Sequence, residues 1–373
     1  MFVLYSVTSF FFCLYVIIIH RFRYHWNRQP EYKAQLQTVT DLKISVVVAF
    51  RNELKNLPIL IKSLENQDLS PEKFEVILCD DSSDDGSGEF VKTYCRNIQR
   101  FRYCSPVKNE HGKKKAVHRG ISISSNEIIV LTDADCITGE RWLSAILSYF
   151  ENYSPDMVIG LVDMNSGRDF AGVLQEMEFL SLTGSGAAAA IMQKPLFCSG
   201  ANLAYKKSSF NSFKDPLSEK IVSGDDTFFM HKLKNESAGK IMLLKSRESA
   251  VTTRRAGSLR EFLDQRSRWA SKSIYYRDRN TVLTALIVYF LNAAILLSLL
   301  MVFAGNGFFW LFPTVFMLKA VTDYLFLRDI MSFFGKKTPA IYFIAGELIY
   351  PFYIVFTPLR ALITGYRWKG RDY

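Results

Sequence analysis

Acidic and basic side chains follow three apolar segments that resemble strands in the first part of the chain. The segments are residues 44–50, 74–79 and 128–132, and the third leads directly into Asp133 and Asp135. In an open parallel sheet, ligands bind in the crevice outside the carboxyl ends of the strands. Three strand ends that carry oxygen and nitrogen ligands therefore predict one shared site, suited to a metal-bound nucleotide.

Asp133 and Asp135 are the candidate metal ligands. Alternate residues on an extended strand point to the same side, so both carboxylates can converge on one cation. A hard cation such as Mg²⁺ or Mn²⁺ would then bridge a diphosphate and neutralise charge on a departing nucleotide. The alternative is a polar turn that ends a strand. The apolar run of residues 128–131 directly before the pair favours the metal site.

Two further segments could bind a nucleotide. Asp80 and Asp81 open segment 80–88, whose Asp, Ser and Gly residues are equally typical of a plain turn. At a strand end, these carboxylates could accept hydrogen bonds from a base N–H or a ribose hydroxyl. Lys113 begins a basic run before the third strand; it is either a solvated helix start or a lysine that pairs with diphosphate oxygens.

Asp225 and Asp226 follow Ser223-Gly224 and precede an apolar run. If Ser223 is the N-cap of a helix, Asp226 three residues later completes a pattern like a capping box. The functional interpretation makes Asp226 a general base that accepts the proton of an attacking hydroxyl. The two interpretations are compatible.

A basic amphipathic segment with Gln265, Arg268 and Trp269 comes just before the long apolar segments of the C-terminal part. One interpretation is an interfacial helix, with basic side chains that reach towards water and a Trp anchor. The functional alternative gives Trp269 a stacking face for a sugar and Arg268 a cation for phosphate.

Composition fits an enzyme that is partly embedded in a membrane. The chain has 373 residues, 49% hydrophobic content and a formal charge of +10, with basic clusters beside apolar segments and no nucleic-acid-binding signature. Its six cysteines show no CxxC pairing or His spacing, so we expect neither a zinc site nor a disulfide framework.

The order of segments predicts four regions: 1–20, a transmembrane signal anchor; 41–253, an α/β domain with a mostly parallel sheet; 254–279, amphipathic interface helices; and 281–363, a transmembrane region. A basic run follows the anchor, so the α/β domain is expected in the cytoplasm. Segments 281–304, 308–327 and 340–363 are each long enough to span a bilayer, although Pro351 and Pro358 could kink the last or make it interfacial.

Small residues are concentrated in segment 180–191, which contains Gly184, Gly186 and four consecutive alanines. They permit close approach of another helix, a lipid or a substrate, or indicate a tightly packed soluble helix. Lys319 and Asp323, four residues apart on one helix face, are expected to pair and to face protein rather than lipid.

Taken in this order, the motifs resemble those of family 2 glycosyltransferases, which have the GT-A fold, in particular the membrane-attached branch of cellulose and hyaluronan synthases and ceramide glucosyltransferases. The resemblance covers about residues 43–269. For the nucleotide-sugar donor, the resemblance implies that Glu53 belongs to the first-strand nucleotide motif, that Asp80 and Asp81 bind uridine, and that Lys113 meets the diphosphate. It implies that Asp133 and Asp135 are the DxD metal pair and that Asp226 is the catalytic base. Gln265, Arg268 and Trp269 would form the Q-x-x-R-W motif, and Gly200 and Asn202 would belong to the acceptor-side segment. Asp225 departs from the family's usual Glu.

The resemblance implies an inverting, multi-pass membrane glycosyltransferase with a cytoplasmic catalytic domain. It would use Mg²⁺ or Mn²⁺ to move a sugar from a nucleotide-sugar donor, expected to be UDP-linked, to a lipid or lipid-linked hydroxyl. The short membrane part favours a lipid acceptor. Because Q-x-x-R-W is frequent in synthases, a processive polysaccharide synthase is the alternative. A catalytically silent membrane scaffold is a third hypothesis, which predicts loss of a metal or base carboxylate. The expected partners are the donor, a lipid or glycan acceptor and the membrane, without nucleic acid.

Overall fold

A computed structural model describes residues 2–34, 40–107, 111–167, 169–218, 221, 223–303, 310–364, 367–368 and 371–372. The chain divides into two compact units. The sheet unit comprises Pro30–Asn165 and Pro195–Arg254, and the helical unit comprises Met1–Gln29, Ser166–Lys194 and Arg255–Tyr373. Each unit is therefore built from segments that are distant in the sequence.

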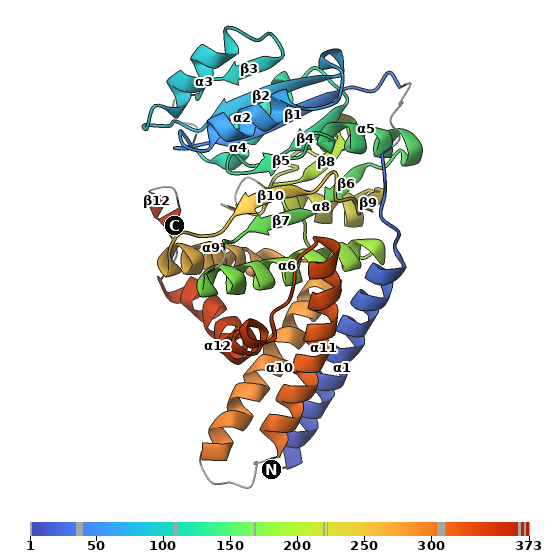
Figure 1. Cartoon of the computed structure of the whole chain (residues 1–373), viewed down its shortest axis with the longest axis vertical. Coiled ribbons are helices and arrows are strands. Elements are labelled where there is room, and N and C mark those ends of the chain that lie inside the picture. Colours follow the sequence, from blue (N-terminus) through green and yellow to red (C-terminus); the bar gives the residue numbers. More distant parts are fainter. Residues whose placement is uncertain are drawn as a thin grey trace. The chain divides into compact units, whose positions relative to one another are not determined.

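The sheet unit contains a seven-stranded, mostly parallel sheet, as the sequence predicts (Figure 1). Its strands, in spatial order, are β3 Phe101–Cys104, β2 Phe74–Asp80, β1 Ile44–Phe50, β4 Ile128–Leu131, β8 Leu203–Lys206, β6 Met157–Gly160 and β9 Ile241–Leu244. β8 runs antiparallel to both of its neighbours, and the other neighbouring pairs are parallel.

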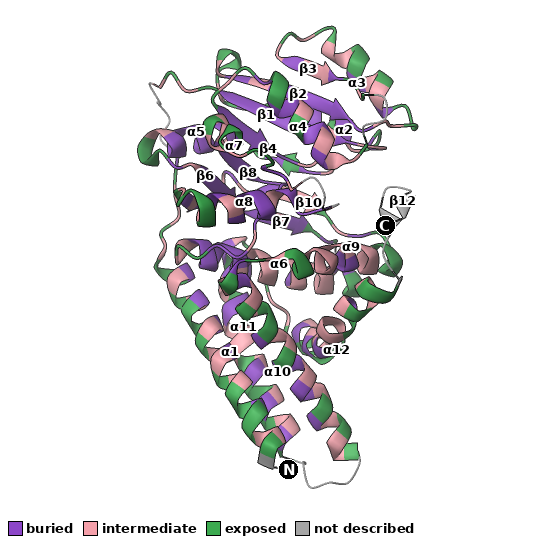
Figure 2. Cartoon of the chain, turned by 180° about the vertical axis from the view of Figure 1, so that it is seen from behind, coloured by how far each residue is buried: buried purple, intermediate pink, exposed green. Residues whose placement is uncertain are grey.

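The three predicted strands are neighbours in this sheet, with β1 between β2 and β4. β1 is almost continuously apolar and buried, which is typical of a parallel strand covered on both faces (Figure 2). Phe50 pairs in register with Asp80, so β1 and β2 end at the same level. Their carboxyl ends therefore bring Arg51 and Asp81 to one edge of the sheet, as expected.

Helices and a second sheet complete the sheet unit. The helices are α2 Leu57–Glu65, α3 Ser87–Cys95, α4 Lys113–Ile123, α5 Trp142–Tyr153, α7 Lys207–Asn211 and α8 Asp225–Glu236, with a 3-10 turn at Pro71–Lys73. The second sheet has the order β5 Ile137–Thr138, β10 Val251–Arg254 and β7 Val162–Asn165. The apolar stripe of α2, from Leu57 to Leu64, is buried.

Among the described residues, the helical unit contains these helices: α1 Phe2–Arg28, α6 Phe170–Ile191, α9 Leu259–Ser271, α10 Arg279–Phe303, α11 Leu311–Phe333 and α12 Ala340–Thr364. A 3-10 turn lies at Lys272–Tyr275, and a short strand pair is formed by β11 Arg367–Trp368 and β12 Arg371–Asp372. α1 packs against α6, α10 and α11. Segment 180–191 is the second half of α6, and a Cβ atom at Gly184 would lie 2.5 Å from Ile330 of α11. Its small residues therefore let another helix approach closely, one of the predicted alternatives.

In the part of the chain that the structure describes, three helices are long and apolar enough to cross a membrane: Val3–Arg28, Arg279–Phe303 and Ala340–Ile363. The predicted second C-terminal span, 308–327, corresponds to α11 except for its first residues, which lie outside the described part. α11 is not among the three because it contains Lys319, Asp323, Arg328 and Asp329. Lys319 is fully buried and bonds Asp323 at 2.7 Å, which confirms the predicted pair.

Candidate active site

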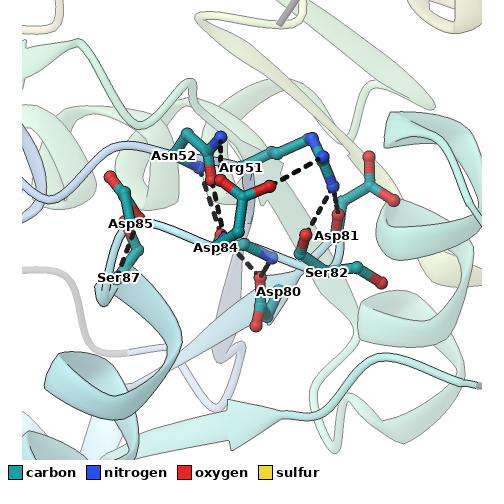
Figure 3. Close-up of polar contacts among 9 residues, drawn as sticks. Arg51, Asn52, Asp80, Asp81, Ser82, Asp84, Asp85 and Ser87 are labelled. Carbon is teal, nitrogen blue, oxygen red and sulfur yellow. Dashed lines mark hydrogen bonds and ion pairs between the residues drawn. The ribbon is translucent and has the colours of Figure 1, made fainter. Parts of the chain in front are cut away.

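The loops that follow β1 and β2 are fastened to each other by hydrogen bonds (Figure 3). Arg51 donates from Nη1 to the carbonyl oxygen of Asp81 at 2.8 Å and also to that of Ser82. The Asn52 amide donates to Asp84 Oδ1 at 2.8 Å and accepts from the Asp84 backbone N–H at 3.0 Å. The loop after β1 therefore holds the loop after β2 in a defined conformation.

Asp80 and Asp81 are both buried and make different contacts. Asp80 Oδ1 accepts from the backbone N–H and the hydroxyl of Ser83, at 2.9 and 2.7 Å, and its Oδ2 accepts from Tyr103 at 3.2 Å. Asp81 Oδ1 accepts from the Gly112 N–H at 2.7 Å. Asp80 thus shapes its own turn, while Asp81 joins the end of β2 to the start of α4. Contacts of either carboxylate with uridine stay a prediction.

Glu53 lies at the same edge of the sheet and is also buried. Its carboxylate accepts from the Asn56 amide at 2.6 Å, and its backbone N–H donates to the Ser87 hydroxyl at 2.9 Å. Its carbonyl oxygen accepts from Asn56 and Leu57, so this residue fixes the entry into α2. Glu53 therefore connects the first strand end to the starts of α2 and α3.

Lys113, Asp133, Asp226 and Gly200 come together from four segments of the sheet unit. Lys113 Nζ lies 2.5 Å from Asp133 Oδ1. Asp226 Oδ2 accepts from the Gly200 N–H at 2.9 Å. A Cβ atom at Gly200 would lie 3.8 Å from both Asp226 Oδ2 and Lys113 Nζ, so the candidate base and the candidate phosphate-binding cation face the same glycine. The family resemblance implies a shared location for these groups, and their roles in the reaction stay predictions.

The electrostatics of this cluster are set by three carboxylates around one cation. Burial alone disfavours the Lys113 ammonium, but Asp133, Asp225 and Asp226 more than compensate and hold the pKa of Lys113 above its usual value. The lysine is therefore a permanent cation at neutral pH. It can pair with an anionic diphosphate as well as with the carboxylates that surround it in this structure.

The start of α8 differs from the capping box considered above. α8 begins at Asp225, its N-cap is Gly224, and no side chain caps it. Gly224 has φ of 83°, a left-handed conformation that glycine adopts without steric cost. Ser223 is therefore not the N-cap, and that interpretation is wrong. Asp225 and Asp226 instead form the first turn of α8, where the helix dipole favours negative charge.

The aspartate pair at the end of β4 lies in a turn rather than on an extended strand, which corrects the predicted geometry. β4 ends at Leu131, and the Cys136 N–H donates to the Asp133 carbonyl at 3.1 Å. Asp133 and Asp135 are partly exposed, whereas Ala134 and Cys136 between and after them are buried. The turn therefore still leaves both carboxylates accessible from outside.

A metal is implied by the DxD resemblance, and the donor set suits it in part. Both groups supply hard carboxylate oxygens, which Mg²⁺ and Mn²⁺ accept. Within the part of the chain that the structure describes, no three His, Cys, Asp or Glu side chains are grouped closely enough to hold an ion. Mg²⁺ is commonly bound by one or two carboxylates together with substrate phosphates and water, so two aspartates fit that mode.

Asn202 is buried at the centre of the sheet unit, where it ties several segments together. Its Nδ2 donates to the carbonyl oxygens of Leu161 and Ser249 at 2.8 and 2.7 Å, and its Oδ1 accepts from Trp142 Nε1 at 3.0 Å. These bonds fix the end of the acceptor-side segment that carries Gly200. The predicted acceptor-site role of Asn202 is not tested by this geometry.

Gln265, Arg268 and Trp269 lie on α9 in the helical unit. Ser258 caps this helix by accepting from the Glu261 N–H at 3.1 Å. The Trp269 ring is contacted by the guanidinium of Arg266, whose carbon lies 4.2 Å from the ring centroid. Roles of the three residues in binding sugar or phosphate stay predictions.

Sequence reasoning missed Arg119 and Gly112. Arg119 donates from Nη2 to the Asp80 carbonyl at 2.9 Å, and the Gly112 N–H bonds Asp81, so both ends of the basic run support the loop after β2. The basic run is evident in the sequence, but sequence reasoning assigned a role only to Lys113. Contacts made by a backbone N–H leave no side-chain signal that could have identified Gly112.

Comparison with known proteins supports the fold and the family. Residues 45–213 match the family model described as "Glycosyl transferase family 2". A 4,4'-diaponeurosporenoate glycosyltransferase of Staphylococcus haemolyticus is 31% identical over 34% of this chain and 32% of its own length. An undecaprenyl-phosphate 4-deoxy-4-formamido-L-arabinose transferase of Yersinia enterocolitica is 30% identical over 25% of this chain and 29% of its own. The chain thus spans about a third of the length of these relatives.

A solved mannosyltransferase of Pyrobaculum calidifontis, in complex with GDP-Man and Mn²⁺, has a similar fold. The TM-score is 0.62 at 14% sequence identity, over 96% of this chain and 99% of that one. The sheet order and this likeness define an α/β protein of the GT-A fold. Segment 45–213, a little under half of the chain, is thus similar to glycosyltransferase family 2.

Proposed function

We propose that this chain is a membrane-bound inverting glycosyltransferase. It moves a sugar from a nucleotide-sugar donor, of which a UDP-linked sugar is the first candidate, to a hydroxyl of a lipid or lipid-linked acceptor. The observation that carries the proposal is the meeting of Asp226 Oδ2 and Lys113 Nζ at Gly200, next to Asp133. A base, a cation and a metal-capable carboxylate then share one location at the carboxyl edge of a parallel sheet.

In the proposed reaction, Asp226 accepts the proton of the acceptor hydroxyl. The hydroxyl oxygen bonds to the anomeric carbon from the face opposite the nucleotide, and the bond from that carbon to the diphosphate oxygen breaks. Lys113 stabilises the charge that develops on the departing diphosphate. The Gly200 N–H holds Asp226 Oδ2 in place before the acceptor arrives. Asp81 supports this arrangement through Gly112, the residue directly before Lys113.

Asp135, with Asp133, is proposed to hold a divalent cation. When bound, Mg²⁺ or Mn²⁺ would supply Lewis-acid stabilisation of the diphosphate leaving group. The complex of the Pyrobaculum relative with Mn²⁺ supports this cofactor. Asp135 is the proposed first ligand, as the resemblance to the DxD motif implies.

A lipid acceptor is favoured by the surface of the helical unit. α12 exposes an apolar stripe at helical spacing, which includes Ile341, Ile344, Leu348, Phe352 and Phe356. Its polar groups point the other way: Glu347 bonds Lys319, and Tyr353 bonds Glu178. An apolar outer stripe with a polar inner face suits contact with lipid. The names of two relatives, a 4,4'-diaponeurosporenoate glycosyltransferase and an undecaprenyl-phosphate 4-deoxy-4-formamido-L-arabinose transferase, support the same acceptor class.

Incubation of the purified full chain with labelled nucleotide sugars, Mn²⁺ or Mg²⁺ and membrane lipid extract tests the proposal. We expect a lipid-extractable product with one added sugar, and loss of that product in excess EDTA with recovery on metal addition. A ladder of products would favour the processive synthase. No transfer and no donor hydrolysis with any nucleotide sugar would overturn the proposal and favour a scaffold.

A further inference from the structure

A single guanidinium on α9 contacts two residues of the Q-x-x-R-W segment. Arg266, one of the positions between Gln265 and Arg268, places its guanidinium carbon 4.2 Å from the centroid of the Trp269 ring and 4.6 Å from that of Phe262. Its Nη1 donates to Gln265 Oε1. Arg266 therefore contacts a motif residue on each side of it along the helix.

Arg266 is itself held by a carboxylate from another helix. Its side chain is 2% exposed, and it donates from Nε to Glu178 Oε1 at 3.0 Å and from Nη2 to Glu178 Oε2. This two-pronged contact fixes the plane of the guanidinium. Tyr353 of α12 donates to the same Glu178 Oε1 at 3.2 Å. The Arg266–Glu178 ion pair and the Tyr353 hydrogen bond thus join three helices, α6, α9 and α12.

A second ion pair joins α9 directly to α12. Arg360 donates to Asp264 Oδ1 and to the Ser267 hydroxyl, both at 2.6 Å. It is less buried, with a side chain that is 30% exposed. Each ion pair joins α9 to another helix. Substitution of Arg360 therefore controls for the loss of an ion pair between helices.

We infer that Glu178 and Arg266 form a positioning device, which sets the orientation of the Trp269 ring and the Gln265 amide for sugar transfer. The inference rests on the proposed function for its effect on turnover. Arg266 acts through the two motif residues and does not touch substrate. A lysine cannot replace it, because an ammonium lacks the planar fork that binds Glu178 with two nitrogens and stacks against two rings.

The test compares Arg266→Lys with the matched control Arg360→Lys in the full chain. For Arg266→Lys we expect kcat to fall about tenfold to a hundredfold, as for misplaced positioning groups, while donor KM changes by less than about threefold. Arg360→Lys should leave kcat within about twofold. In the double variant Arg266→Lys/Trp269→Phe, the Arg266→Lys change should lower kcat by a smaller factor than it does in the wild-type chain, because part of its effect acts through the Trp269 ring.

A second readout is independent of activity. The fluorescence of Trp269, obtained as the difference between proteins with Trp and Phe at that position, should become more accessible to acrylamide in Arg266→Lys and in Glu178→Gln, but not in Arg360→Lys. Multiplicative losses of kcat in the double variant, or unchanged quenching in both Arg266→Lys and Glu178→Gln, would overturn the inference. If the wild-type chain transfers no sugar, the proposed function fails, and the quenching result alone decides the positioning role.

Discussion

Replacement of Asn202 by alanine should destabilise the sheet unit strongly. The substitution removes three hydrogen bonds from a side chain that is 2% exposed. It leaves the Ser249 carbonyl and the Trp142 indole N–H without the Asn202 partner, whereas the Leu161 carbonyl keeps its bond from the Val251 N–H. A buried polar group that loses its hydrogen-bond partner lowers the free energy of unfolding by about 1–3 kcal/mol. With partial entry of water into the space left behind, we expect a total loss of about 3–6 kcal/mol in the free energy of unfolding.

At about 2–4 °C per kcal/mol for a domain of this size, the melting temperature should fall by about 6–24 °C. Thermal unfolding of the detergent-purified chain, followed by intrinsic fluorescence, measures this shift. Asn152→Ala is the matched control: its amide bonds Tyr32 and Ser148, but the residue is exposed, so a change within about 0.5 kcal/mol is expected.

The result that would refute the structural reasoning is an Asn202→Ala protein that melts within about 2 °C of wild type. If that stable variant had also lost sugar transfer, Asn202 would act on the acceptor, as the family resemblance implies. If it were stable and active, neither role would hold.

Two further predictions concern other parts of the chain. Gly184→Leu should separate α6 from α11 and cost about 1–3 kcal/mol in the free energy of unfolding, because a Cβ atom at Gly184 would already lie 2.5 Å from Ile330. The control is Gly346→Ala, which should be tolerated because its Cβ would lie 3.4 Å from its nearest neighbour. Equal melting temperatures of the two variants would contradict the packing argument. The hydrogen bond from Cys79, opposite in register, lowers the pKa of the Cys104 thiol. Titration of the thiolate ultraviolet absorbance, taken as the difference between the wild-type and Cys104→Ser proteins, should therefore give a midpoint below that of an ordinary cysteine, and a midpoint at or above it would contradict this.

The sheet could be predicted because local sequence pattern and tertiary position agree. β1 matches the predicted segment 44–50, and β2 and β4 differ from prediction by one residue each at their ends. Continuous β-branched runs between polar segments indicate buried parallel strands. The position of Asp226 beside Lys113 could not come from pattern alone, since these residues are 113 positions apart in the chain; the family resemblance supplied that link.

Turn geometry was the weaker part of the prediction. Ser223 resembled an N-cap, yet Gly224 takes that position because its left-handed φ lets the chain enter α8 without a side-chain cap. Asp133 and Asp135 were predicted on an extended strand, yet the backbone bond from Cys136 closes a turn there. Both errors arise where side-chain type leaves the backbone conformation undetermined. The buried role of Arg266 was likewise invisible, because Glu178 lies 88 positions away.

The central claim is that Asp226 is the base at a site shared with Lys113 and Asp133. Its most direct test is the turnover of Asp226→Asn with the donor that the wild-type chain uses, alongside nucleotide binding measured by calorimetry. The control is Glu127→Gln, an exposed carboxylate directly before β4, at the end of that strand opposite to Asp133. We predict nucleotide affinity within about threefold of wild type, a fall in kcat of about 10²–10⁴-fold for Asp226→Asn, and wild-type turnover for the control. An Asp226→Asn protein that transfers sugar at close to the wild-type rate would contradict the account.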